Sequence, residues 1–186
     1  MLVSSAFGAA LQPRTTKAPW PRSGDALALS RAAGLTPRRH EFFAYHVHAH
    51  LDVFVNARGV RVPSGIGINI SDPGVKSVRL PDGTVAYGYI KQCRNACISP
   101  LHTHDDSGII HTESQMYRPN RLGEFFTEWR VRLSKTCVGA YCGNVKFYVD
   151  GKRYSGDPRA ITLTNLKDIV IVIGRPPAVI PSKFPQ

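Results

Sequence analysis

YHVHAHLDVFVN, residues 45–56, is the stretch that decides the predicted fold. Histidines stand at alternate positions in it, His46, His48 and His50, with small or apolar residues between them. Successive side chains of a strand point to opposite faces, so this alternation predicts a half-buried strand with one polar and one apolar face. The segments NARG (56–59) and VRVP (60–63) then predict a turn and a returning strand, which completes a hairpin.

The rest of the chain predicts further short strands and one longer helix. Turn signals lie between short strand-like runs in SVRLPDGTVAYGYI (77–90) and NVKFYVDGKRYSG (144–156). GIIHTES (108–114) resembles a short strand, and the apolar run DIVIVIG (168–174) suits a central strand. RLGEFFTEWRVRL (121–133) spaces its apolar residues along one helix face. We therefore predict an α+β fold: a mixed, mainly antiparallel sheet with one packed helix, arranged much like a β-grasp.

The chain of 186 residues is long enough for one domain with flanking segments. We expect a basic, Pro-containing N-terminal arm over 1–44, with a short helix near 25–34. A metal-binding α+β domain should follow over 45–175, and a Pro-rich tail over 176–186. The first residues, MLVSSAFGAALQPR, are apolar but lack the basic region that opens a secretory signal.

The net charge of +11 raises the question of a polyanionic partner. Lys and Arg are scattered, however, and their one local excess falls in the arm, where a solvated leader is the simpler interpretation. No basic stripe interleaved with aromatic residues and no zinc-finger or helix-turn-helix pattern favours nucleic acid as a partner. No run approaches the ~20 apolar residues of a transmembrane helix.

The four cysteines form two closely spaced pairs, Cys93 with Cys97 and Cys137 with Cys142 in the order of the chain. An even number in paired spacing favours disulfides and an oxidising compartment. The spacing alone leaves three connectivities open, and thiolates that bind a soft metal ion are the alternative.

Six of the seven histidines fall in two short stretches, the second of which is LHTHDDSGIIHTE (101–113). Imidazole is the commonest protein ligand for zinc and copper, so we predict a Zn or Cu ion as the cofactor. The strand rise of ~3.3 Å separates the outer histidines of the first stretch by about 13 Å, too far for all three to meet one ion. Two of them with one or two from the second stretch would form one site, and two adjacent ions are also conceivable. The candidate ligands are His46, His48, His50, His102, His104 and His111.

Several carboxylates lie close to these histidines in the sequence. They could bind the ion or orient an imidazole ring through its second nitrogen. Asp105, Asp106 and Glu113 would also be the candidate general bases if the site were catalytic, and Asp52 is the fourth carboxylate nearby. His40, beside two arginines in the arm, is expected at the surface.

The stretches HVHAHLDVFVN and LHTHDDSGIIHTES, with LGEFFTEW and YVDGK, resemble a group of uncharacterised bacterial and archaeal proteins often predicted to be exported. That group carries H-x-H-A-H-L-x-x-F-V-N followed by L-H-T-H-D-x-[ST]-G-I-I-H. The resemblance spans most of 46–174. It implies that the two histidine stretches act as one unit in an extracytoplasmic protein, periplasmic or secreted, and it implies no particular activity.

Three classes of function remain open from the sequence. The first is a transition-metal binding protein, either a carrier, a buffer or a sensor; the scarcity of methionine argues against a thioether site for Cu(I). The second is a metal-dependent enzyme, hydrolytic with zinc or redox-active with copper, whose three-histidine site keeps an open position. The chain has no H-E-x-x-H, G-x-S-x-G, Walker or G-x-G-x-x-G motif. The third is a structural or interaction domain without metal. A further interpretation is that the clustered imidazoles act as a pH switch.

Overall fold

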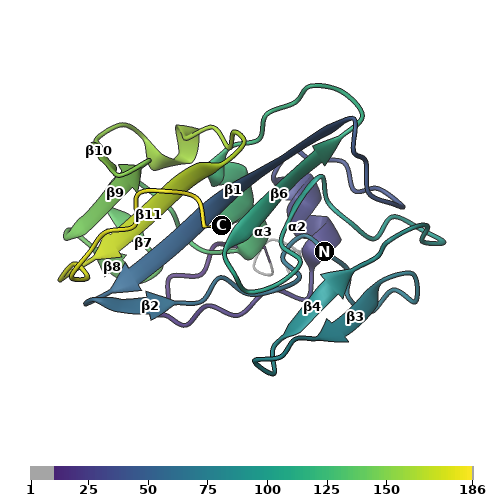
Figure 1. Cartoon of the computed structure of the whole chain (residues 1–186), viewed down its shortest axis with the longest axis horizontal. Helices are drawn as coiled ribbons and strands as arrows, with labels where there is room; N and C mark the ends of the chain where they lie inside the picture. The colour runs from purple at the N-terminus through teal and green to yellow at the C-terminus, as the bar shows by residue number, and fades with distance from the viewer. Residues whose placement is uncertain (1–10, 186) are drawn as a thin grey trace, which may run out of the picture.

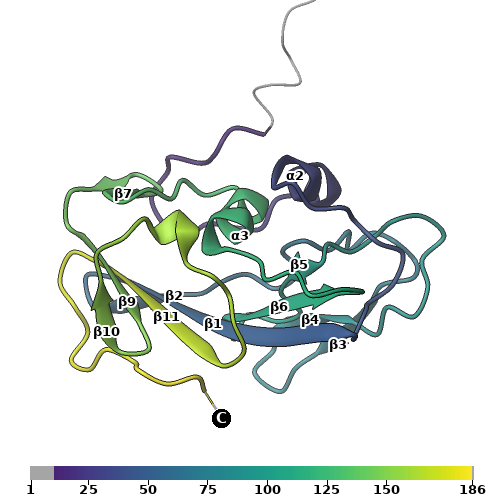
Figure 2. The ribbon, with the colours of Figure 1, turned by 90° about the horizontal axis from the view of Figure 1, so that it is seen from above.

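The computed structural model of the chain describes residues 11–185, so the first ten residues of the predicted arm and the last residue of the tail lie outside it. The described residues form an α+β fold, in which two α-helices lie on one side of a sheet of seven strands (Figures 1 and 2). The sheet consists of β1 (Tyr45–Val55), β2 (Arg58–Val60), β5 (Leu101–His102), β6 (Ile109–Ser114), β9 (Val145–Val149), β10 (Lys152–Tyr154) and β11 (Lys167–Ile173). The helices are α2 (Ala26–Ala32), α3 (Leu122–Trp129) and the 3₁₀ turn η1 (Pro158–Ala160). Two small hairpins stand apart from the sheet: β3 (Lys76–Arg79) with β4 (Val85–Gly88), and β7 (Cys137–Val138) with β8 (Tyr141–Cys142).

The strand order is β10-β9-β11-β1-β6-β5, with β2 paired to the end of β1. Only the central pair, β1 with β11, is parallel, and the other pairs of this sheet are antiparallel. The prediction of a mixed, mainly antiparallel sheet with a packed helix is therefore confirmed. The comparison with a β-grasp stays a prediction.

The alternation seen in β1 separates two faces of the sheet. Ala49, Leu51 and Val53 point into the main apolar core, where they meet the helix side of the molecule. Neighbouring strands add side chains in the same register: Leu51 lies opposite Ile169 of β11, and Ala49 lies opposite Ile110 of β6. The face that carries the histidines is the one away from α2 and α3, and it is turned toward the viewer in Figure 1.

Helix α3 supplies much of the core on the covered face, which is the face of the sheet that α2 and α3 pack against. Phe125, Phe126 and Trp129 are fully buried, and the Glu124 carboxylate accepts a hydrogen bond from the Arg121 N–H at the start of the helix. The helix ends earlier than the predicted 133, because Arg130 adopts the left-handed conformation with φ 61°. A left-handed residue after the last turn is a common helix stop.

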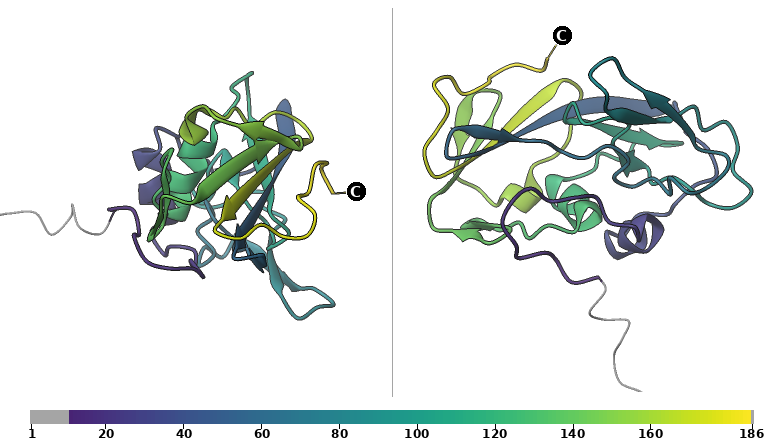
Figure 3. Two further views of the ribbon diagram at one scale, coloured as in Figure 1. Left: turned by 90° about the vertical axis from the view of Figure 1, so that its left-hand side faces the viewer. Right: turned by 90° about the horizontal axis from the view of Figure 1, so that it is seen from below.

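Residues 11–44, expected as an arm, contribute to the same core. Trp20 is 1% exposed and meets Trp129 edge to face at 5.7 Å between ring centroids, and the Trp129 indole N–H donates to the Trp20 carbonyl. The predicted short helix is α2, which packs near α3 (Figure 3). The described part of the arm is therefore packed on the domain, because Trp20 and Leu35 belong to its apolar core.

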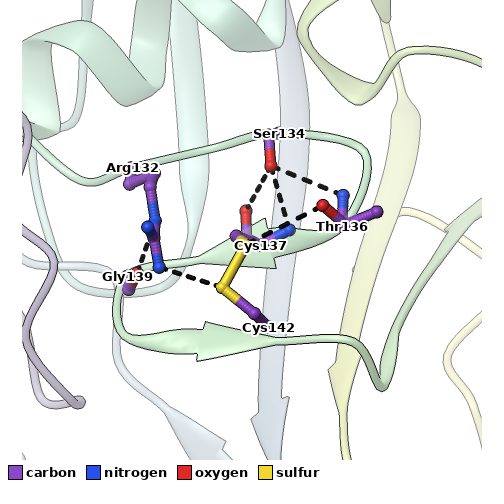
Figure 4. Close-up of a disulfide and its surroundings, with 6 residues drawn as sticks. All are labelled: Arg132, Ser134, Thr136, Cys137, Gly139 and Cys142. Atoms are coloured by element: carbon purple, nitrogen blue, oxygen red, sulfur yellow. Dashed lines mark hydrogen bonds between the residues drawn. A yellow bond between two sulfur atoms is a disulfide. The ribbon is translucent and has the colours of Figure 1, made fainter.

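Both cysteine pairs form disulfides between neighbours in the sequence, Cys93 with Cys97 and Cys137 with Cys142. The first is buried in a second apolar cluster with Ile68, Ile90 and Ile98. The second joins β7 to β8, where Arg132 donates to the Gly139 carbonyl and approaches the Cys142 sulfur (Figure 4). No helix within residues 11–185 is long and apolar enough to cross a membrane.

Candidate metal centre

Strand register brings histidines from both sequence stretches into one row across the sheet. His48 of β1 lies directly opposite His111 of β6, and His111 lies directly opposite His102 of β5. Directly paired residues share a face, so the three imidazoles project on the side of the sheet away from the helices. His46 and Glu113 form the next pair along β1 and β6, on the same face. His104 follows β5 and returns to the same place, since its ring contacts those of both His102 and His111.

These side chains converge on Glu113. Its Oε1 lies 3.3 Å from His46 Nε2, 3.6 Å from His111 Nδ1 and 3.8 Å from His102 Nε2. Nitrogens of neighbouring rings are equally close: His102 Nε2 lies 3.2 Å from His104 Nε2, and His46 Nε2 lies 3.5 Å from His111 Nδ1. We call this group the histidine cluster; its members are His46, His48, His102, His104, His111 and Glu113.

Backbone carbonyls fix the orientation of two rings. His102 Nδ1 donates to the Ser99 carbonyl at 2.9 Å, and His104 Nδ1 donates to the Tyr87 carbonyl at 2.5 Å. A carbonyl only accepts, so Nδ1 carries a proton in both rings and Nε2 is the nitrogen that remains for a ligand. The two Nε2 atoms face each other across 3.2 Å within the cluster. Metal-binding histidines are usually oriented by such a contact on the second nitrogen.

Burial lowers the pKa of four of these imidazoles and so favours their neutral form. Desolvation lowers the pKa of His111 to about 3, with help from the neighbouring His104 and His46. The pKa of fully buried His102 is lowered well below its usual value by desolvation and by the rings of His104 and His111. The pKa values of His46 and His48 are also lowered, mainly by desolvation. At neutral pH these rings therefore present lone pairs, the form that binds a metal ion.

The spacing of the donor atoms fits a transition-metal ion. Ligand atoms at ~2.0–2.1 Å around a tetrahedral ion lie ~3.3 Å from one another. The separations of 3.2–3.8 Å in the cluster are close to this value. In each of two sets, the potential ligand atoms all lie within 4.8 Å of one another. One set is His102, His104, His111 and Glu113, and the other is His46, His48 and His111.

The second oxygen of Glu113 also suggests a ligand. Glu113 is 3% exposed, and its Oε2 has no hydrogen-bond partner among the described residues. Desolvation is the main cause that raises the pKa of this carboxyl, while the facing His46 and His104 and the Phe42 backbone N–H counteract it. A buried carboxylate oxygen without a partner is costly unless a cation neutralises it.

His50 does not join the cluster, although it alternates with His46 and His48 in the sequence. Its Nδ1 lies 3.0 Å from Asp168 Oδ1 and 3.7 Å from Asp52 Oδ2, and its Nε2 contacts the Ser107 carbonyl at 3.0 Å. Asp168 is fully buried on the neighbouring strand β11. These three side chains form a separate set of potential donors, nearer the middle of the sheet.

The other carboxylates singled out from the sequence have different surroundings. Asp105 accepts hydrogen bonds from Ser107 within its own loop, and Asp106 forms an ion pair with Arg61. Glu113 is thus the only one of the three candidate bases that lies in the histidine cluster.

Sequence reasoning missed Glu41 and Asp168. Glu41 was assigned to the arm, yet its Oε1 lies 3.5 Å from His104 Nε2. Asp168 looked like the edge of an apolar run, and only the pairing of β11 with β1 places it opposite His50. Neither residue has a spacing in the sequence that marks it, because both contacts depend on long-range packing. His40 lies outside the cluster, where its Nδ1 contacts the Glu41 carbonyl.

A cavity opens beside the histidine cluster. It has a volume of about 290 Å³ and lies against the β4 side of the β3–β4 hairpin. His104 and Glu41 form its polar wall, and Tyr87 and Tyr89 are among its other lining residues. A small molecule in this cavity would therefore contact one ring and one carboxylate at the edge of the cluster.

The chain matches no protein-family model, no curated protein and no solved structure. The geometry of the cluster is therefore the feature of the molecule that indicates a function.

Proposed function

We propose that this protein binds a divalent transition-metal ion, copper or zinc, through the histidine cluster, as a carrier, buffer or sensor. One observation carries the proposal: neutral imidazoles from three neighbouring strands and a buried carboxylate meet at the separations of ligands around one ion. The burial of Glu113 with an oxygen that has no hydrogen-bond partner within residues 11–185 supports a cation at this place, because a cation would offset the cost of that burial.

The ligands of the cluster favour metal ions that prefer nitrogen donors. Imidazole suits zinc and copper, whereas calcium and magnesium prefer oxygen ligands. Copper(II) has the highest affinity of the divalent first-row ions for such sites, and zinc is the common ion of tetrahedral histidine sites. All cysteines among the described residues are in disulfides, so thiolate ligation plays no part in the proposal.

We also propose an extracytoplasmic location. Two disulfides support it, because such bonds persist in oxidising compartments. The resemblance of the histidine motifs to proteins predicted to be exported supports the same location.

A metal-dependent enzyme is the second candidate, and the cavity at His104 favours it. A substrate in this cavity would lie beside the ion and beside Glu41, whose carboxyl pKa is raised by desolvation and by Glu113. A carboxylate near a metal-bound water is a suitable general base. Turnover of ester, amide or phosphate substrates by the zinc-loaded protein would favour this candidate over a carrier.

The test is elemental analysis of the untagged protein after exposure to Cu(II) or Zn(II) and dialysis. We expect retained metal in the unchanged protein and at least a tenfold weaker affinity in His104→Ala. His40→Ala is the matched control, because it removes a histidine outside the cluster and should leave the affinity unchanged. Binding should weaken steeply on acidification, since protons compete with the ion for several imidazoles at once. Absence of retained metal, or equal loss in His40→Ala, would contradict the proposal.

A further inference from the structure

The histidine cluster contains more donors than one ion uses. Five imidazoles and Glu113 belong to it, and Glu41 adds a second carboxylate at His104. A tetrahedral transition-metal site takes four ligands. A single ion with four ligands would leave two of these six cluster donors unused.

Two overlapping sets of donors can be distinguished, and His111 belongs to both. The sets are in contact, since Glu113 Oε1 of the first lies 3.3 Å from His46 Nε2 of the second. The position of His111 follows from topology, because β6 lies between β1 and β5 in the sheet. The His111 ring centroid lies 4.4 Å from that of His48 on one side and 4.4 Å from that of His104 on the other. His111 is therefore the one ring of the cluster flanked by both sets.

The carboxylates are distributed in a way that suits two cations. Glu113 approaches rings from three strands with one oxygen, while its second oxygen is buried without a partner among the described residues. Glu41 approaches the far side of the cluster at His104. Two carboxylates partly balance the charge of two divalent ions, which a low-dielectric site otherwise disfavours.

We propose that the histidine cluster is a two-ion centre in which His111 is shared. His102, His104, His111 and Glu113 form the first site, and His46, His48 and His111 form the second. This inference rests on the proposed function, because it assumes that the cluster binds metal.

The sharing has a defined chemistry. An imidazole ring offers two nitrogens, and it binds one ion through each only after it has lost its N–H proton. When the second ion binds, His111 therefore becomes an imidazolate: one metal–nitrogen bond forms, the N–H bond breaks, and the proton leaves to solvent. No electron is transferred.

The two sites should differ in affinity and in reactivity. The first has four donors and includes the fully buried His102, so it should fill first. The second has three histidines, one of them the partly exposed His46, and therefore has a position open to water or to a small anion. A three-histidine site with an open position is the arrangement that activates a bound water.

Titration of the full chain with Cu(II), followed by electron paramagnetic resonance, tests the sharing. The signal should grow up to one equivalent and then fall as the second equivalent binds, because an imidazolate bridge couples the two spins. Retention of one equivalent only, or of two without coupling, would overturn this inference and leave the proposed function standing. Binding of no copper at all would contradict both.

Variants separate the two sites. His48→Ala should retain one equivalent with an undiminished signal, because only the second site loses a ligand. His111→Ala should bind at most one ion and show no coupling, and His40→Ala should behave like the unchanged protein. Circular dichroism of each variant checks the fold, and a coupled pair of ions in folded His111→Ala would overturn the inference.

Discussion

The two faces of β1 belong to one strand but have opposite tasks. Ala49, Leu51 and Val53 lie in the apolar core beneath α3, whereas His46 and His48 lie on the face without helices. Burying the apolar side chains stabilises the fold, at roughly 25 cal/mol per Å² of apolar surface. Burying imidazoles and carboxylates removes them from water and has a cost unless each polar atom finds a partner.

This difference indicates which face of the sheet determines stability and which determines binding. The open face is the one that carries the histidine cluster. On the covered face Trp20 and Trp129 pack against each other, and the Trp129 indole N–H donates to the Trp20 carbonyl. On the open face Glu113 keeps an oxygen without a partner among the described residues. We infer that changes on the covered face affect folding, and that changes at the cluster affect binding.

The largest expected effect on stability is that of Trp129→Ala. This fully buried indole packs against Trp20, Phe125 and Phe126 and donates a hydrogen bond to the Trp20 carbonyl. Its removal leaves a cavity and should lower the free energy of unfolding by ~3–5 kcal/mol. Urea denaturation in metal-free buffer at pH 7 measures the change. If the free energy of unfolding decreased by no more than in His48→Ala, the assignment of stability to the covered face would be wrong.

Much of this contrast could be predicted from the sequence, and some of it could not. The period of two in 45–55 predicts both faces of β1, and the spacing in 121–133 predicts the apolar side of α3. Those patterns are local, and local patterns determine which face of an element is buried. The convergence of the two histidine stretches is predicted from the spacing of the histidines and from the resemblance of the two motifs to one group of proteins.

The residues that face each other across neighbouring strands could not be predicted from the sequence. Nothing local indicates that His111 lies opposite both His48 and His102, because register depends on long-range pairing. For the same reason His50 was grouped with its two neighbours, although Asp168 on β11 draws it into a different contact. The packing of Trp20 likewise requires a partner 109 residues away.

The second prediction concerns a polar residue on the covered face. Glu128 of α3 is fully buried, and desolvation raises its carboxyl pKa to about 8, although a hydrogen bond from the Ser99 hydroxyl opposes the rise. The folded state then holds a proton that the unfolded state releases above its ordinary pKa of 4.5. The free energy of unfolding should therefore fall by a few kcal/mol as pH rises from 4.5 to 8, and level off above that range.

The variant Glu128→Gln tests this linkage. It keeps an acceptor for Ser99 but has no proton to lose, so its stability should change less over this pH range and exceed that of the unchanged protein at pH 8. Urea denaturation at several pH values measures both. Asp82→Asn is the control, because this exposed carboxylate in the β3–β4 turn lies near Arg61 and not near Glu128, and it should retain the original pH dependence. An unchanged slope in Glu128→Gln would assign the pH dependence to other groups.

The smallest effect sharpens the comparison within β1 itself, between His48 and His50. Both are histidines on the same face, but His50 has its ring nitrogens engaged by Asp168 and by the Ser107 carbonyl, whereas His48 meets other rings of the cluster. His50→Ala should lower the free energy of unfolding by ~1–3 kcal/mol, because it leaves the buried Asp168 without its partner. It should leave the copper stoichiometry unchanged.

His48→Ala should do the reverse, losing one copper equivalent with little change in the metal-free unfolding curve. If His50→Ala also lost copper, the set formed with Asp52 and Asp168 would be a metal site in its own right, and the division of the open face into a binding cluster and a structural pair would be wrong.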